Sequence, residues 1–222
     1  MKVWTVANQK GGVGKTTTSV SLASLLSQWG MRTLLIDIDP HASLTSYFRY
    51  DPDVLEESVY SLFRGVAEQR DVDPVSLVYP TGTDGLDLMP AEMALATLDR
   101  QAGRLDGMGL VIKQALERLG DRYDHVILDC PPILGILMIN ALAACEQLII
   151  PVQTEFLALK GLERMLHTLE MVTKSRHVPL PYLIVPTMFD RRTRASIDTL
   201  RVMRESYPDR LWRGLILSLI HI

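Results

Sequence analysis

The chain has 222 residues, of which 47% are hydrophobic and 22% are charged, and its formal net charge is −3. This length and composition predict one globular domain with a substantial core, and they exclude a strongly basic protein. No apolar run reaches the roughly 18 residues that a membrane span needs, and the first residues carry no signal-peptide pattern. Cys130 and Cys145 lack metal-ligand spacing, which indicates the reducing cytoplasm. We therefore expect a cytoplasmic protein with no membrane partner.

Short apolar segments alternate with helical patterns along the chain. We predict strands over residues 3–7, 33–38, 86–89, 125–128, 148–152 and 182–185, and helices over residues 15–29, 108–119, 134–144, 161–174 and 195–206. The strand segments are apolar on both faces, as buried parallel strands are. The alternation predicts an α/β fold with a doubly wound, mostly parallel sheet that binds ligands at the carboxyl ends of its strands. Residues 51–84, rich in acids, proline and turn residues, are expected to form a surface insertion.

The segment NQKGGVGKTTTSV, residues 8–20, has the features of a phosphate-binding loop. It departs from G-x-x-x-x-G-K-[ST] because Gln9 stands at the first glycine position, and it carries a second lysine, Lys10. A strand precedes the loop and a helix follows it, so backbone N–H groups would close around phosphate oxygens. The predicted nucleotide-binding set within the loop is Lys10, Gly11, Gly12, Val13, Gly14, Lys15, Thr16 and Thr17. A plain glycine turn with a surface lysine is the alternative, which the complete string disfavours.

Two residues of this loop have predicted chemical roles. Lys15 would reach the β- and γ-phosphates of a nucleotide, and the Thr16 hydroxyl would bind Mg²⁺.

Several motifs together resemble the ParA/MinD group of ATPases. KGGVGKTT resembles the deviant Walker A loop of that group, LLIDIDPHASLTSYF its first switch region, and VILDCPP its Walker B segment and second switch. NALAACEQLIIPVQTEFLALKGL and VPTMFDRRTRAS are similar to the ParA branch. The resemblance covers most of the chain and implies a P-loop NTPase fold and ATP hydrolysis. It also implies that Lys10 reaches across a dimer to the other subunit's ATP, where it would neutralise the charge of two facing nucleotides.

Three aspartates end predicted strands beside the phosphate loop. The resemblance assigns Asp39 to positioning the attacking water, which makes it catalytic together with Lys10 and Lys15. It assigns Asp37 to the neighbourhood of Mg²⁺, which Asp129 would hold through water. A helix N-cap is the alternative for one such aspartate, and three of them together disfavour it.

The chain departs from the family pattern after the second strand. The family commonly has D-P-Q-G-N where this chain has DPHAS, so His41 and Ala42 differ. In the simpler interpretation His41 caps the switch helix, and in the alternative it contacts the phosphates.

The resemblance also places residues around the nucleotide base and on a DNA-binding surface. Asn140 would face the nucleotide, Pro151 and Gln153 would lie over the base at the dimer seam, and Asp190 would lie near the base or sugar. Between Arg176 and Arg213 there are eight arginines against four acids, and in the ParA branch this region binds DNA without sequence preference. The predicted phosphate contacts are Arg191, Arg192, Arg201 and Arg204, with Arg194 on the same helix face as the last two. A solvated basic face is the alternative, and the lack of interleaved aromatics argues against sequence reading.

These features imply a ParA-type switch with ATP and Mg²⁺ as cofactors. ATP closes a sandwich homodimer, the dimer binds nucleoid DNA, and an adaptor of the ParB type or an equivalent stimulates hydrolysis. The cycle would segregate DNA or position a cellular cargo, and DPHASLTSYF resembles ParA-like proteins that place chemotaxis arrays. One alternative is a membrane-associated MinD-like regulator, which needs a C-terminal amphipathic helix. Another is a metabolic enzyme on the same scaffold, such as a nitrogenase-reductase-like protein, which needs cluster cysteines, or a dethiobiotin synthetase, which would lack Lys10.

The C-terminal residues carry one further expectation. LSLIHI matches one reading frame of a common transposon-based sequencing adapter. We therefore expect a single ATPase domain over residues 1–215, truncated at its C-terminus, and a non-native tail at residues 216–222. A natural apolar C-terminal strand is the alternative.

Overall fold

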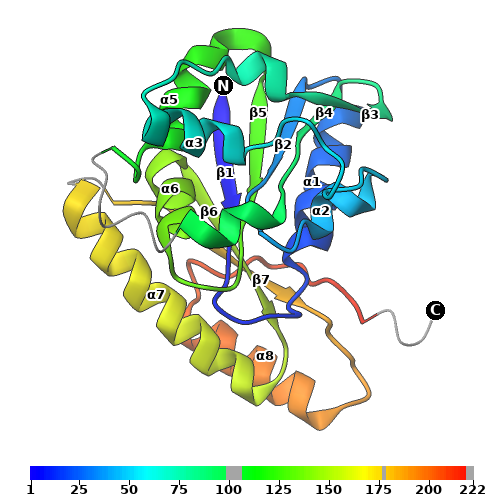
Figure 1. The fold of residues 1–222 in the computed structure, drawn as a ribbon. Helices are drawn as coiled ribbons and strands as arrows, with labels where there is room; N and C mark the ends of the chain where they lie inside the picture. The colour runs from blue at the N-terminus through cyan, green and yellow to red at the C-terminus, as the bar shows by residue number, and fades with distance from the viewer. Residues whose placement is uncertain (99–106, 177–178, 219–222) are drawn as a thin grey trace.

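Seven strands form one sheet in the order β3-β4-β2-β5-β1-β6-β7 (Figure 1). The structure is a computed structural model, and it describes residues 1–98, 107–176 and 179–218. Neighbouring strands are parallel except for the antiparallel pair of β3 and β4. The strands are β1 (Lys2–Val6), β2 (Thr33–Asp37), β3 (Tyr79–Thr83), β4 (Leu86–Met89), β5 (His125–Asp129), β6 (Gln147–Gln153) and β7 (Tyr182–Thr187). The predicted doubly wound, mostly parallel α/β sheet is therefore confirmed.

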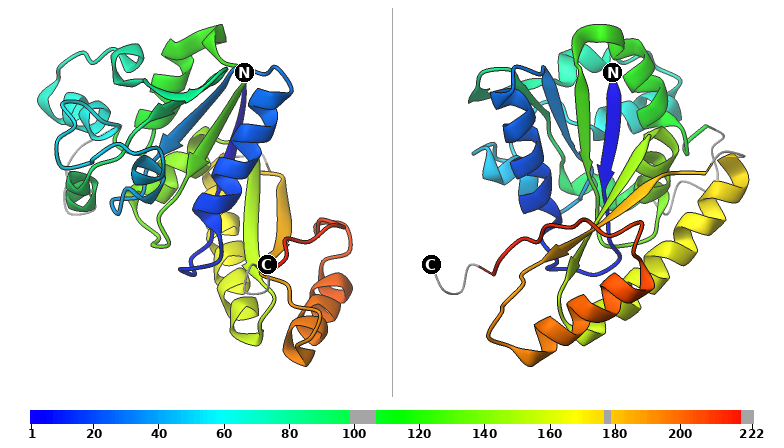
Figure 2. Two further views of the ribbon diagram at one scale, coloured as in Figure 1. Left: turned by 90° about the vertical axis from the view of Figure 1, so that its right-hand side faces the viewer. Right: turned by 180° about the vertical axis from the view of Figure 1, so that it is seen from behind.

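Helices cover both faces of the sheet (Figure 2). One face packs against α1 (Lys15–Gln28) and the short α2 (Ser43–Tyr47). The other face packs against α3 (Tyr60–Glu68), α5 (Val111–Leu119), α6 (Ile136–Ala144) and α7 (Phe156–Arg176), and α8 (Arg194–Ser206) packs on α7. Short 3₁₀ helices are η1 (Pro74–Leu77), η2 (Met93–Thr97) and η4 (Gly120–Arg122). This double cover explains why the five residues of β2 are all buried, and hence why the strand is mostly apolar.

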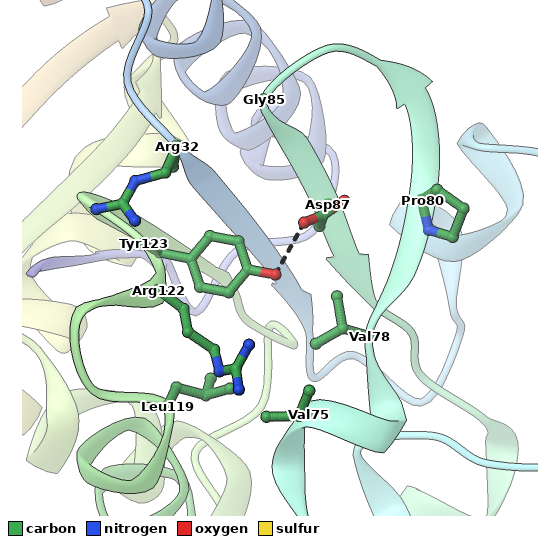
Figure 3. Close-up of a pocket in the computed structure, with 9 residues that line it drawn as sticks. All are labelled: Arg32, Val75, Val78, Pro80, Gly85, Asp87, Leu119, Arg122 and Tyr123. Atoms are coloured by element: carbon green, nitrogen blue, oxygen red, sulfur yellow. Dashed lines mark hydrogen bonds between the residues drawn. The ribbon is translucent and has the colours of Figure 1, made fainter.

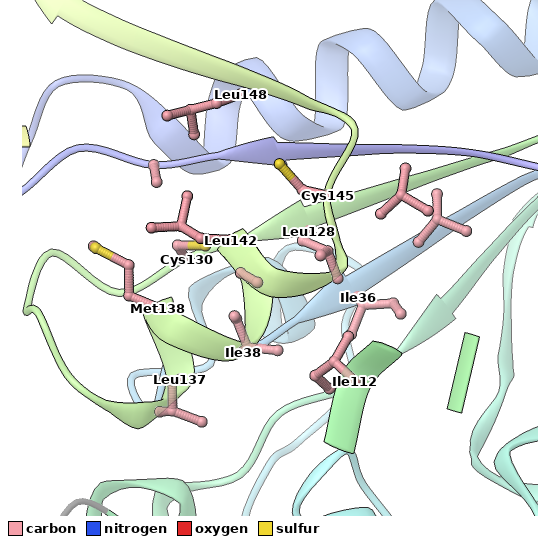
Figure 4. Packing of buried hydrophobic residues seen from close by; sticks show 14 of the residues in the cluster. Ile36, Ile38, Ile112, Leu128, Cys130, Leu137, Met138, Leu142, Cys145 and Leu148 are labelled. Atoms are coloured by element: carbon pink, nitrogen blue, oxygen red, sulfur yellow. The ribbon is translucent and has the colours of Figure 1, made fainter. Parts of the chain in front are cut away.

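The two cysteines belong to the larger of the two core layers. Cys130 and Cys145 are free thiols without solvent exposure, and they lie in the layer that Leu142 and Leu148 also line (Figure 4). Burial raises the pKa of the Cys130 thiol well above its usual value. Both cysteines therefore serve as small apolar core residues, in agreement with the absence of metal-ligand spacing.

The expectation of a surface insertion at residues 51–84 is wrong. The segment contains α3 and the edge strand β3, and Leu62, Phe63 and Leu77 are buried in the core. The helix has only nine residues, and the acids and turn residues on either side of it give the whole segment a polar composition that hid it. The segment adds the antiparallel edge to the sheet.

The chain beyond α8 runs alongside β7. The N–H of Trp212 donates to the carbonyl of Ile184 at 2.8 Å, and the N–H of Ile216 donates to the carbonyl of Pro186 at 2.9 Å. Isolated parallel bridges join Ile184 to Leu211 and Phe189 to Leu217. Residues 219–222 of the predicted tail lie outside the described residues, and the division at residue 215 stays a prediction. Within the described ranges, no helix combines the length and apolar character that crossing a membrane requires.

Candidate nucleotide site

The phosphate loop connects the carboxyl end of β1 to the start of α1. Gly12 and Gly14 have φ values of +71° and +87°, a backbone region that glycine adopts at little cost. A Cβ atom on Gly11 or Gly12 would meet nothing within 4 Å, so these residues border open space. No side chain caps α1, which leaves its first N–H groups available to an anion. The loop therefore has the conformation that phosphate binding needs.

The edge strand β7 holds the loop in place. The hydroxyl of Thr187, at the end of β7, donates to the carbonyl of the buried Val13 at 2.8 Å. Sequence reasoning missed this contact, because the two residues are 174 positions apart in the chain.

The two lysines of the loop occupy different surroundings. Lys15 is buried, with 8% exposure, and its ammonium group donates to the carbonyl of Lys10 at 3.3 Å. Burial lowers the pKa of Lys15, and the carboxylates of Asp129 and Asp39 oppose this effect. The ammonium group of Lys10 instead forms an ion pair with Glu155, beside the start of α7. Lys15 thus belongs to the loop interior, whereas Lys10 faces away from it.

Two buried carboxylates meet at the carboxyl ends of β2 and β5, where Asp37 and Asp129 are register partners. Asp129 accepts hydrogen bonds from the hydroxyls of Thr16 at 2.7 Å and Ser19 at 2.9 Å. Burial raises the pKa of Asp37 to about 7 and that of Asp129 to about 6. A hydroxyl and carboxylate oxygens are the ligands that Mg²⁺ prefers, and a cation here would relieve the cost of two adjacent buried charges. The predicted metal residues Thr16, Asp37 and Asp129 are therefore brought together and fit Mg²⁺.

Two supporting residues of this pair were not predicted. Ser19 lies three residues after Thr16 on α1, a spacing that could have revealed it. Thr45 donates to Asp37 from its N–H at 2.9 Å and from its hydroxyl at 2.8 Å. No local pattern in the sequence identifies Thr45.

The switch segment after β2 corrects one expectation. Asp39 accepts a hydrogen bond from the N–H of His41 at 3.0 Å, and the same carboxylate oxygen lies 2.9 Å from Nδ1 of His41. The N-cap of α2 is Ala42, without a side-chain cap, so the interpretation of His41 as a helix cap is wrong. Ala42 has a φ of +51°, which explains why the family motif carries glycine at this position.

Of the residues predicted around the base, Pro151 and Gln153 lie at the edge of the sheet where the nucleotide site is, whereas Asn140 does not face it. Pro151 and Gln153 lie at the carboxyl end of β6, and the carbonyl of Pro151 accepts a hydrogen bond from the Asn8 side chain at 2.8 Å. Asn140 is fully buried, and its amide bonds to the backbone of Met108, Ile112 and Ile136. The expectation that Asn140 faces the nucleotide is therefore contradicted, because its amide ties α6 to the start of α5.

The predicted basic surface is present but partly neutralised. Its arginines are all exposed: Arg191, Arg192, Arg194, Arg201 and Arg204. Arg192 forms an ion pair with Asp190 at 2.8 Å, and Asp198 lies 3.5 Å from Arg194 and 3.1 Å from Arg201. Among the described residues, Arg191 and Arg204 form no ion pair. Asp190, which follows β7, was predicted to lie near the base or sugar, and in this structure its carboxylate pairs with Arg192 of the basic surface.

A cavity of about 520 Å³ lies at the opposite edge of the sheet (Figure 3). Arg32, Gly85 and Tyr123 line it, and each lies just before β2, β4 or β5. The hydroxyl of Tyr123 donates to Asp87 at 2.8 Å. The cavity is at the amino ends of the strands, so it is separate from the nucleotide site.

Comparison with known proteins identifies the family. The profile of a family described as "AAA domain" matches residues 1–180. The chain is 37% identical to the sporulation initiation inhibitor protein Soj of Bacillus subtilis over 216 residues, which cover 97% of this chain and 83% of that protein. It is 33% identical to the chromosome partitioning protein ParA of Caulobacter vibrioides, covering 97% of this chain and 80% of that protein.

A solved structure agrees with the fold. A cobyrinic acid a,c-diamide synthase from Mycobacterium smegmatis, with a bound ATP analogue and magnesium, has a TM-score of 0.89 and 37% identity, covering 98% of this chain and 87% of that one. Sequence, fold and the geometry of the phosphate loop agree, and the chain belongs to the ParA/Soj family of chromosome-partitioning ATPases, which hydrolyse ATP on a P-loop NTPase fold.

Proposed function

We propose that this ATPase forms an ATP-dependent sandwich dimer that binds DNA without sequence preference, and that hydrolysis releases the DNA so that DNA is segregated or a cargo is positioned. The observation that carries the proposal is the separation of the two loop lysines. Lys15 is buried inside its own loop, whereas Lys10 is 25% exposed at its side chain and points to α7. A lysine that lies outside its own loop can reach a nucleotide in a second subunit once it leaves Glu155.

Different residues of the site have different roles in hydrolysis. Backbone N–H groups of residues 11–14 and the ammonium group of Lys15 bind and orient the phosphates of ATP. Thr16, Asp37 and Asp129 would hold Mg²⁺, which would supply positive charge against the phosphates of ATP. Asp39 orients the attacking water, and its contact with His41 fixes the direction of its carboxylate. Lys10 of the other subunit completes the charge around the γ-phosphate.

The basic surface supports DNA binding as an electrostatic contact. Arg191 and Arg204 are exposed and form no ion pair within the described part of the chain, so each can contact a phosphate directly. Arg192 and Arg201 must exchange a carboxylate partner for a phosphate. A dimer doubles the surface, which makes binding depend on ATP and on salt. The proposed setting is the nucleoid in the cytoplasm, with an activating adaptor of the ParB type.

A DNA-binding titration tests the proposal. Fluorescence anisotropy on two unrelated duplexes at low salt should give equal affinities in the presence of a non-hydrolysable ATP analogue and no binding without it. Lys10→Ala should still bind the analogue but should lose DNA binding. If the wild-type protein with the analogue fails to bind either duplex, the DNA role is rejected. Binding to anionic vesicles instead would favour the MinD-like alternative.

A further inference from the structure

The segment that carries Lys10 is anchored to neighbouring elements. The Lys10 N–H donates to the side chain of Asn8 at 3.1 Å, and the side chain of Gln9 donates to Thr168 of α7 at 2.6 Å. A Cβ added to Gly161, inside α7, would lie 3.3 Å from the Cβ of Lys10. The absence of a side chain at Gly161 therefore lets the lysine stem lie against α7.

The ammonium group of Lys10 has a specific partner at the start of this helix. It forms an ion pair and hydrogen bond with Oε1 of Glu155, and their side chains are 25% and 38% exposed. The pair is partly shielded from water, which also lowers the pKa of Lys10 through desolvation. Glu155 makes no other side-chain hydrogen bond or ion pair within the described residues, so this carboxylate serves Lys10.

We propose that Glu155 is a positioning residue that holds Lys10 within its own subunit and thereby sets how tightly the ATP-bound dimer forms. The inference rests on the proposed function, in which Lys10 reaches the nucleotide of the other subunit. To do so, Lys10 must exchange the carboxylate of Glu155 for phosphate oxygens. Glu155 therefore competes with the partner's ATP, and each dimer has two such competitions.

The size of the effect follows from the exposure of the pair. Partly exposed ion pairs change an equilibrium by up to about fivefold each. Two pairs are broken per dimer, and each changes the equilibrium by about 1.4- to fivefold, so replacing Glu155 should tighten the dimer by about two- to twenty-five-fold. Nucleotide binding by the monomer should not change, because Lys15 rather than Lys10 lies within the loop.

The test measures dimer dissociation constants by analytical ultracentrifugation with a non-hydrolysable ATP analogue. Glu155→Gln removes the charge and keeps the shape, and it should tighten the dimer by the stated factor. Glu155→Asp keeps the charge on a shorter side chain and should give an intermediate value. The matched control is Glu163→Gln, on the same helix, where Glu163 pairs with Lys160 instead; it should dimerise like wild type. ATP turnover of Glu155→Gln should rise at low protein concentration and match wild type when the protein is fully dimeric.

The outcomes separate this inference from the proposed function. An unchanged or weaker dimer for Glu155→Gln, while Lys10→Ala fails to dimerise, overturns the role of Glu155 alone. A Lys10→Ala variant that dimerises like wild type overturns the trans role of Lys10, and the inference falls with it.

Discussion

The buried carboxylate of Asp37 should make the nucleotide-free protein less stable as the pH rises. Burial, and the neighbouring Asp129, raise the pKa of Asp37 from 3.8 to about 7. The folded state therefore binds the proton more tightly than the unfolded state. The resulting stabilisation is fully present below pH 3.8 and is lost as the pH rises to about 7. A shift of this size corresponds to about 4 kcal/mol between the two limits.

Asp37→Asn removes this dependence because the amide stays neutral. The asparagine oxygen can keep both hydrogen bonds from Thr45, which go to one oxygen of Asp37, but the NH₂ group then faces the N–H of Asp39, which donates to the other oxygen at 3.1 Å. Losing a buried hydrogen bond costs about 1–3 kcal/mol, so the variant should be more stable than wild type at pH 8 by about 1–3 kcal/mol. The advantage over wild type should grow by about 2–3 kcal/mol between pH 5 and pH 8. The same variant should lose ATP hydrolysis, because one of the proposed Mg²⁺ residues is gone.

Urea unfolding at pH 5, 6, 7 and 8, with EDTA and without nucleotide, provides the measurement. Asp124→Asn is a suitable control, because Arg32 holds the pKa of Asp124 at about 2 and the stabilisation from that pair is lost only as the pH falls below 3.8. Its unfolding free energies should run parallel to those of wild type from pH 5 to pH 8. Parallel curves for Asp37→Asn and wild type would refute the reasoning.

Three further substitutions test separate parts of the site. Lys15→Ala should abolish ATP binding in a titration with a fluorescent analogue, since it removes the buried cation of the loop; unchanged affinity would reject the loop assignment. Asp39→Ala should bind ATP and dimerise in size-exclusion chromatography but lose about 10²–10⁴ in turnover, because the water loses its orienting carboxylate; full adaptor-stimulated turnover would move this role to another residue. Arg204→Ala should flatten the slope of log DNA affinity against log salt by about 2 per dimer. Arg192→Ala should flatten the slope less, because Asp190 already neutralises that arginine, and equal effects would contradict this ranking.

The sequence predicts best those features that depend on local pattern. The apolar strands at β2 and β5 and the glycines of the phosphate loop were placed correctly because burial on both faces and positive φ values each leave a clear residue signature. The start of α7 was placed five residues late, because Gly161 was taken as the first residue of the helix. Its real role is to allow the close approach of Lys10.

Features that depend on distant residues were not predictable from one sequence. Asn140 lies in a segment that resembles the ParA branch, yet its amide forms hydrogen bonds with backbone groups up to 32 residues away in the sequence. Glu155 is 145 residues from Lys10, and no sequence pattern near either residue predicts that they pair. Helix α3 was missed for a different reason: it has only nine residues and lies within a segment rich in acids and turn residues, and only the packed core shows that Phe63 is buried.

The charges at the nucleotide site give a physical reason for joining hydrolysis to dimerisation. Within one subunit, the carboxylates of Asp39 and Asp129 act on the buried cation Lys15, and Asp37 lies next to Asp129. A bound triphosphate adds further negative charge, and Mg²⁺ neutralises only part of it. Lys10 is the nearest additional cation of the loop, but its own subunit holds it on Glu155. We infer that the charge balance needed for hydrolysis arises only when a second subunit supplies its Lys10, so that turnover follows dimerisation rather than ATP binding alone.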